Sequence, residues 1–163
     1  MAQNVDNMQV RGKLRDRSLA GFQKQMRDWD VAMPAVEPLV LDFGLGQFEK
    51  TGLIEYWIAN EEQAGYCGKY LFVFDGQMCP LHSHAKKHET FYVVKGSVTL
   101  TVNGKPHTMA QGAVLAMPPG DVHSFRGNGN ALLLEISTPC LVADNRFEDP
   151  RIMQWLRSAV AGA

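Results

Sequence analysis

One short stretch of the sequence, CPLHSHAKKHETFYVVKG at residues 79–96, holds an unusual number of titratable side chains for a β-strand region. His82 and His84 lie two residues apart, so on an extended strand both imidazoles point to the same face. Glu89 begins the next apolar run, and His123 lies on a later one. Three imidazoles and a carboxylate on one interior face form a coherent divalent-metal site. A lone HxH pair or a lone His123 is also typical of a surface or structural residue, so the inference depends on all four.

The segment that must position these side chains, from residue 39 to residue 139, has the pattern of many short strands. Val98, Leu100 and Val102 alternate with threonines, and Asn103-Gly104 then supplies a two-residue hairpin turn. Short strands without intervening helices predict an antiparallel sandwich or barrel. The runs with strand character are LVLDF, GLIEYWIA, KYLFVF, TFYVVKGSVTLTV, AVLAMP, HSFRG and ALLLEIS.

Helical spacing appears on both sides of this segment. We expect a first helix from Ser18, a suitable N-cap, which ends before the prolines of AMPAVEP. We expect a second helix capped by Asp149, with Pro150 at its first position. The apolar stripes are Leu19, Phe22, Met26 and Trp29 in the first helix, and Ile152, Trp155, Leu156 and Val160 in the second.

These patterns predict a single domain over residues 1–163. It consists of an N-terminal helical extension at about 1–35, a barrel at about 39–139 and a C-terminal helix at about 149–161. Residues 1–12 are polar and are expected to be loosely structured.

The composition excludes several classes of partner. Charged residues make up 20% of the chain and the net charge is -1, so no basic excess favours nucleic acid or an anionic membrane surface. The apolar runs are too short to span a bilayer, and the first residues contain no apolar signal-peptide region. The three cysteines form no CxxC pair, which favours reduced thiols. We therefore expect a cytoplasmic protein that binds neither nucleic acid nor membrane.

The spacing of the candidate ligands resembles both motifs of the cupin superfamily, over about residues 66–128. Five residues separate Gly76 from the HSH triplet, four separate the triplet from Glu89, and six separate Glu89 from Gly96. In the second motif, Gly112, a Pro-Pro-Gly turn and His123 have the matching intervals, and Gly127 stands where asparagine is usual. The resemblance implies an all-β fold, a jelly-roll type cupin β-barrel, here with N- and C-terminal flanking helices. It also implies four metal ligands: His82, His84, Glu89 and His123. A cupin barrel that has lost its metal is the alternative.

Longer blocks resemble the D-lyxose ketol-isomerase family of short cupins, in the same order from about residue 42 to residue 152. They are YCGKYLFVFDGQMCPLHSH, KHETFYVVKGSV, LEIST and FEDPRI. Some members carry a longer insert between the second histidine and the glutamate, whereas this chain has four residues there. The resemblance implies interconversion of an aldose and its ketose with a divalent metal, typically Mn²⁺. The ligand types also admit Fe²⁺, Co²⁺, Ni²⁺ or Zn²⁺.

Aldose–ketose isomerisation can pass through a cis-enediol and then needs groups that move protons. Glu135 lies inside the apolar run ALLLEIS, where a buried carboxylate is costly unless it is partnered, so it is a candidate base. Lys87 shares the face of Glu89 on an extended chain and could stabilise enediolate charge. The resemblance implies the same two roles, and Lys69 and Arg151 match blocks that could hold sugar hydroxyls. The simpler alternatives are that Glu135 is bonded to a loop or exposed at a strand edge and that Lys87 is solvated at the barrel mouth. For Lys69 and Arg151 the alternative is a salt bridge at the end of a helix or strand.

Two other functions use the same metal spacing. An iron-dependent dioxygenase would need no acid–base pair at Lys87 and Glu135, and it would consume oxygen. A non-enzymatic sugar-binding cupin would bind a sugar without forming product. We also expect a homodimer, because the striped terminal helices and the run GLIEYWIA exceed the apolar surface that one small barrel needs.

Overall fold

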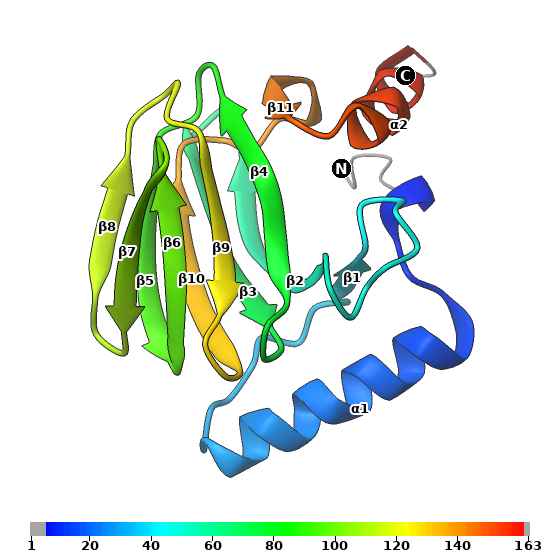
Figure 1. Ribbon diagram of the computed structural model, residues 1–163, viewed down its shortest axis with the longest axis vertical. Coiled ribbons are helices and arrows are strands. Elements are labelled where there is room, and N and C mark those ends of the chain that lie inside the picture. Colours follow the sequence, from blue (N-terminus) through cyan, green and yellow to red (C-terminus); the bar gives the residue numbers. More distant parts are fainter. Residues whose placement is uncertain (1–5, 162–163) are drawn as a thin grey trace.

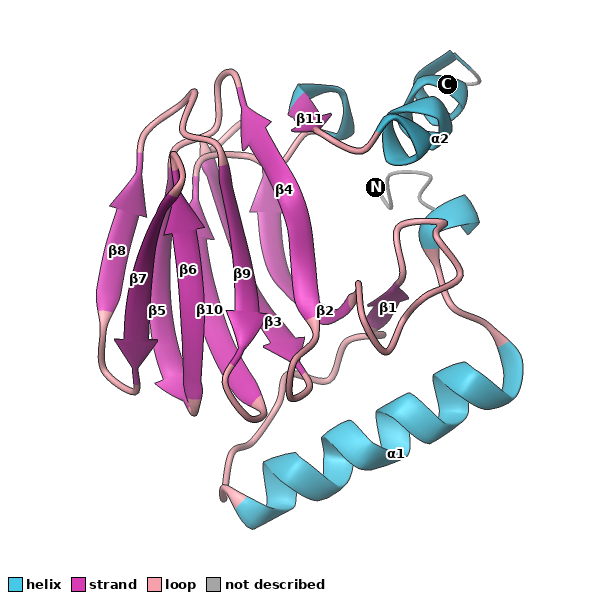
Figure 2. Ribbon diagram, in the orientation of Figure 1, coloured by secondary structure: helices cyan, strands magenta, loops and turns pink. Residues whose placement is uncertain are grey.

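The computed structural model describes residues 6–161, and the side chains of residues 6–157. Two antiparallel sheets face each other (Figures 1 and 2). The first has the order β1 (Leu39–Leu41), β2 (Leu53–Glu61), β3 (Tyr66–Val73), β10 (Ala131–Ser137), β5 (Glu89–Lys95) and β8 (Val114–Met117). The second has the order β11 (Asn145–Phe147), β4 (Met78–His84), β9 (His123–Gly127), β6 (Ser97–Val102) and β7 (Lys105–Ala110). Neighbours distant in sequence, such as β3 and β10, give the jelly-roll connectivity, so the predicted all-β cupin fold is confirmed.

The predicted hairpin forms between β6 and β7. Val98, Leu100 and Val102 are buried while the threonines between them are partly exposed, which is the period of two that one covered face requires. Asn103 and Gly104 have φ values of 49° and 77°, the backbone that a tight turn between twisted strands demands. The inward residues of both sheets meet in the core, where the rings of Phe91 and Phe125 pack edge to face with centroids 5.6 Å apart.

Helix α1 (Gly12–Asp28) lies against the outer face of the first sheet (Figure 1). The Phe22 ring stacks on Tyr56 and meets Phe72 edge-on, with centroids 5.1 and 5.0 Å apart. The predicted start at Ser18 is wrong, because the helix begins six residues earlier at Gly12. The Ser18 hydroxyl donates to the Leu14 carbonyl, a bond that a serine inside a helix commonly makes.

The prediction of loose structure over residues 1–12 is wrong for the described part of that range. Residues Asp6–Met8 form a 3-10 turn, and Met8 and Val10 are buried. The Val10 amide donates to the Val40 carbonyl, so the segment is fixed along β1. Residues 1–5 lie outside the described residues.

Helix α2 (Pro150–Ala161) follows a second 3-10 turn, Val142–Asp144, and strand β11, a strand that the sequence pattern did not predict. The predicted start of α2 is confirmed, since Asp149 accepts a hydrogen bond from the Arg151 amide at 2.9 Å and Pro150 follows the cap. Ile152 and Leu156 are buried as predicted, whereas the Val160 side chain lies outside the described residues. Neither α1 nor α2, within the described range, combines the length and the apolar character that crossing a bilayer requires.

The homodimer stays a prediction, but the structure points to a different surface for the dimer contact. The α1 stripe packs on the chain's own sheet, so it gives no argument for a partner. The outer face of the first sheet, away from α1, carries exposed apolar side chains on strands that pair directly. These side chains are Tyr66, Tyr92, Val114 and Ile136.

We expect a second copy of the chain to cover this face. Val114→Asp should then convert a dimer into a monomer in sedimentation experiments at micromolar protein. The same change at Val36, which is exposed in the loop before β1, should leave the dimer intact. A monomeric wild-type chain would contradict the expectation.

Candidate metal centre and active site

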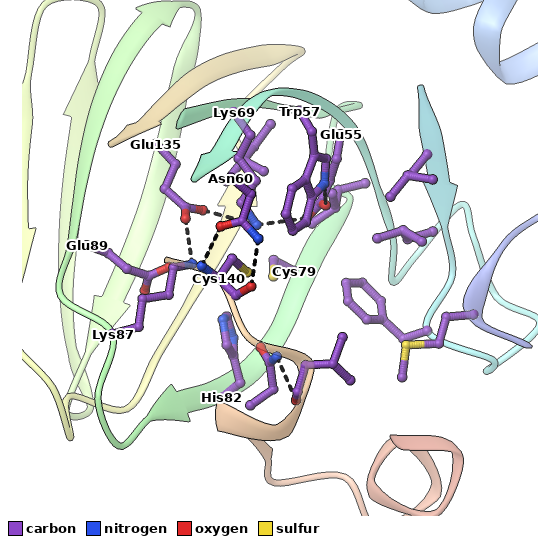
Figure 3. A pocket seen from close by; sticks show the side chains of 18 of the residues that line it. Glu55, Trp57, Asn60, Lys69, Cys79, His82, Lys87, Glu89, Glu135 and Cys140 are labelled. Carbon is purple, nitrogen blue, oxygen red and sulfur yellow. Dashed lines mark hydrogen bonds and ion pairs between the residues drawn. The ribbon is translucent and has the colours of Figure 1, made fainter. Parts of the chain in front are cut away.

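A cavity of about 670 Å³ opens between the sheets and has walls of contrasting character. One wall carries charged and imidazole side chains, whereas much of the remainder is apolar (Figure 3). Strands of both sheets contribute, together with the segment around Met8 and with Leu156 of α2. The charged wall consists of Glu55, Lys69, His82, His84, Lys87, Glu89 and Glu135.

The three predicted histidine ligands converge. His82 and His84 lie at the end of β4, and His123 begins β9 directly opposite His82. The candidate ligand atoms of these three side chains all lie within 4.8 Å of one another. All three side chains are buried, so the fold concentrates imidazole nitrogens where apolar groups would otherwise pack.

The hydrogen bonding of these imidazoles fits a metal ion. Nδ1 of His82 lies 2.8 Å from the Pro80 carbonyl oxygen, and Nδ1 of His123 lies 3.1 Å from that of Asp121. A ring nitrogen that donates to a carbonyl leaves the opposite nitrogen as a lone pair, which is how proteins orient metal-ligating histidines. Among the described residues, Nε2 of His123 and both ring nitrogens of His84 are buried without a hydrogen bond. A neutral imidazole has one N–H and one lone pair, so His84 and His123 each bury a lone pair that a divalent ion would satisfy.

Glu89 completes the set at the start of β5. Its Oε2 lies 3.1 Å from Nε2 of His123 and 3.4 Å from Nε2 of His84. Although burial raises the pKa of this carboxyl, contacts with His123 and His84 and the charge of Lys87 hold the pKa well below its usual value. Burial lowers the pKa of His82, with His123 and His84 adding to the effect. A neutral imidazole and an ionised carboxylate are the forms that bind a metal.

A chain of alternating charges leads away from Glu89. Nζ of Lys87 lies 2.6 Å from Oε1 of Glu89 and 2.5 Å from Oε1 of Glu135. Nζ of Lys69 in turn lies 3.4 Å from Oε2 of Glu135 and 3.4 Å from Oε1 of Glu55. All five side chains are buried, so each charge has its compensation inside the protein (Figure 3).

Both lysines are ammonium ions at neutral pH. Burial alone would lower the pKa of Lys87 and of Lys69, but the Glu135 carboxylate and further acidic neighbours outweigh burial and raise both pKa values. Each lysine is therefore suited to stabilise negative charge rather than to accept a proton. Glu135 is the carboxylate that both lysines contact.

Glu55 and Trp57 belong to this wall, although neither was among the site residues predicted from the sequence. The indole Nε1 donates to Oε2 of Glu55 at 2.7 Å, and Nζ of Lys69 lies 5.0 Å from the centre of the Trp57 ring. The signal was available, because Glu55 interrupts the apolar run GLIEYWIA as Glu135 interrupts ALLLEIS. Two residues apart on β2, Glu55 and Trp57 share the inward face.

The structure brings Lys69 to the cavity but not Arg151. The Arg151 side chain is 63% exposed, and its guanidinium pairs with Asp149 at 2.6 Å. It does not line the cavity, and the contact of Arg151 with sugar hydroxyls stays a prediction. The reason is local, because side chains in the first turn of a helix lean back toward the cap, which here is acidic.

Comparison with known proteins places this geometry in a family. Residues 71–137 match the model of the Cupin domain. The D-lyxose/D-mannose isomerase of Thermosediminibacter oceani is 33% identical to the chain, over 69% of this chain and 77% of that protein. The chain belongs to the D-lyxose ketol-isomerase family of cupins. The D-lyxose ketol-isomerase of Cohnella laeviribosi, another relative of this cupin, is 31% identical over 69% of this chain and 76% of its own length.

A solved structure supports the fold of this cupin over nearly its whole length. The L-ribose isomerase of Cellulomonas parahominis superposes with a TM-score of 0.69 and covers 92% of this chain and 97% of that one. Its sequence identity is 16%, so the likeness bears on the fold alone. Because it extends beyond residues 71–137, it includes flanking elements as well as the barrel.

Proposed function

We propose that the chain is a divalent-metal-dependent aldose–ketose isomerase, which acts on a small sugar such as D-lyxose through a cis-enediol. The observation that carries this proposal is the place of Lys87, between a ligand of the candidate metal site, Glu89, and a second buried carboxylate, Glu135. The named relatives support a sugar isomerase in general. The metal and the enediol are inferred from the arrangement of the residues.

His82, His84, Glu89 and His123 are the residues that would hold the ion. When bound, a divalent ion supplies a Lewis acid that polarises a carbonyl and a template that orients neighbouring oxygens. Mn²⁺ is the ion that we expect, and the nitrogen and oxygen donors also suit Fe²⁺, Co²⁺, Ni²⁺ or Zn²⁺.

Glu135 is the proposed base. It takes the proton from C2 of the open-chain aldose, the electron pair of that bond forms the C1–C2 double bond, and negative charge develops on the former carbonyl oxygen. Return of the proton from Glu135 to C1, with transfer of the C2 hydroxyl proton to the oxygen on C1, gives the ketose. The Lys87 ammonium lies 2.5 Å from Glu135, so it is placed to stabilise the developing charge.

Lys69, with Glu55 and Trp57, forms the adjoining wall of the cavity. We propose that Lys69 donates to sugar hydroxyls there. The Lys69 ammonium pairs with two carboxylates, those of Glu55 and Glu135, each at 3.4 Å. This arrangement limits the rotamers of a long side chain and prepares it to bind.

A panel of aldoses, incubated with protein loaded with Mn²⁺, tests the proposal directly. Ketose formation from at least one pentose or hexose is the expected result. Oxygen consumption without ketose would favour the dioxygenase. Saturable sugar binding without any product would favour a binding protein, and either outcome would contradict the isomerase.

We expect Lys87→Met to lower kcat by about 10²-fold or more with little change in KM, because the ammonium acts on charge that develops in the transition state. Methionine keeps much of the stem and deletes the charge. Lys86→Met is the matched control, because the neighbouring Lys86 side chain is exposed and should be dispensable. Metal content must be measured beside the rate, since Lys87 also contacts Glu89. A Lys87→Met protein with full metal and normal kcat would remove Lys87 from the mechanism.

A further inference from the structure

The segment after β10 returns to the metal site along the outer edge of the second sheet (Figure 1). In β11, Asn145 pairs with His84 and Phe147 pairs with His82. The Phe147 ring also stacks on the His82 imidazole, with centroids 5.1 Å apart and an interplanar angle of 22°. This segment therefore supports the strand that carries two candidate ligands.

Asp144, the residue before β11, has a buried carboxylate with an unusual set of partners. Its Oδ1 accepts hydrogen bonds from the backbone amides of Ala85 and Lys86 at 3.1 and 3.2 Å. Its Oδ2 accepts from the amides of Lys86 and Lys87 at 3.1 and 3.0 Å. Three consecutive N–H groups thus converge on one carboxylate, an arrangement that compensates a buried anion without a cationic side chain.

These three amides belong to the loop that joins the candidate ligands His84 and Glu89. The same loop carries Lys87, whose side chain is buried and whose Nζ reaches both Glu89 and Glu135. A lysine has four rotatable bonds, so the place of its ammonium depends on how firmly its backbone is held. Displacements of about 1 Å of a positioned group can cost about 10²-fold in rate.

We propose that Asp144 is a positioning residue that fixes the Ala85–Lys87 backbone and thereby holds the Lys87 ammonium at Glu135. The inference rests on the proposed function, because it takes Lys87 as part of the isomerase machinery. Asp144 touches neither the sugar nor the reacting atoms and acts through the loop. Its carboxylate is specifically required, since an asparagine would place an NH₂ group against at least one backbone N–H.

The first arm of the test is amide hydrogen exchange on the Mn²⁺-loaded full chain. The amides of Lys86 and Lys87 should exchange at least about tenfold more slowly than those of an open loop. Asp144→Asn should remove this protection. Asp75→Asn is the matched control, because Asp75 accepts a backbone hydrogen bond from Gly129 in a turn at the opposite end of the barrel.

The second arm is a double-mutant cycle on turnover. Asp144→Asn should lower kcat by about 10–100-fold with KM changed less than about threefold. In the Lys87→Met background the same change should lower kcat by less than about threefold further, because the group that Asp144 positions is already gone. If Asp144→Asn acted through a general loss of folding, its fold-reduction in kcat would be the same in the Lys87→Met background as in the wild type. This outcome would overturn the proposal.

The exchange arm separates this proposal from the proposed function. If the wild-type chain isomerises no aldose, the proposed function fails, and the exchange rates still decide whether Asp144 holds the loop. The wild-type measurement also depends on no variant that must fold. Slow exchange at Lys86 and Lys87 supports the positioning role, whereas exchange at open-loop rates overturns it.

Discussion

Glu135→Gln is expected to retain the fold and the metal and to lower kcat by about 10²–10⁴-fold, the contribution typical of a positioned base. Glutamine preserves the size of the side chain and removes the group that accepts the proton. KM should change little, because the lost interaction belongs to the transition state.

The charge chain explains why this variant should fold. Removing one partner of a buried ion pair costs about 3–5 kcal/mol when it leaves a charge without compensation. Here Lys87 keeps its contact with Glu89 at 2.6 Å, and Lys69 keeps its contact with Glu55 at 3.4 Å. Each lysine therefore retains one carboxylate after the substitution.

Turnover of the best aldose, metal content and thermal unfolding should be measured together for this variant. Glu62→Gln is the control, because Glu62 is exposed in the turn between β2 and β3 and does not line the cavity. Near-wild-type turnover in Glu135→Gln would show that another group moves the proton. A variant that loses its metal would show that Glu135 acts on the ligands instead.

Removal of divalent ions with a chelator is expected to abolish turnover, and Mn²⁺ should restore it. The physical basis is the buried lone pairs of His84 and His123, which have no hydrogen bond among the described residues and whose natural partner is a cation. A ligand that binds only the folded state, at a free concentration of 100 times its Kd, stabilises that state by about 2.7 kcal/mol. The metal should therefore also raise Tm.

His123→Gln should prevent both the metal-dependent rise in Tm and the turnover. His107→Gln is the matched control, because His107 lies exposed on β7 and away from the cavity. Full turnover in chelator-treated protein with no detectable metal would contradict the metal site. Metal binding unchanged by His123→Gln would exclude His123 as a ligand.

The sequence by itself determined those features that depend on local spacing. Alternation with a period of two places His82 and His84 on one face, and Asn103-Gly104 sets the β6–β7 hairpin, whatever the rest of the chain does. A carboxylate inside an apolar run marked Glu135 as a buried group that needs partners. The C-terminal helix was also predictable, because Asp149 and Pro150 act on the backbone next to them.

Only the tertiary structure decided which side chains meet. The contact of Lys69 with Glu135 depends on the register of β3 against β10, and the bonds of Asp144 join residues that are 57–59 positions apart. Arg151 matched a family block, yet its helix turns it toward Asp149 and solvent. Such partners are set by sheet order and by the path of the connecting segments, which are properties of long-range packing, whereas periodicity reports only on neighbours along the chain.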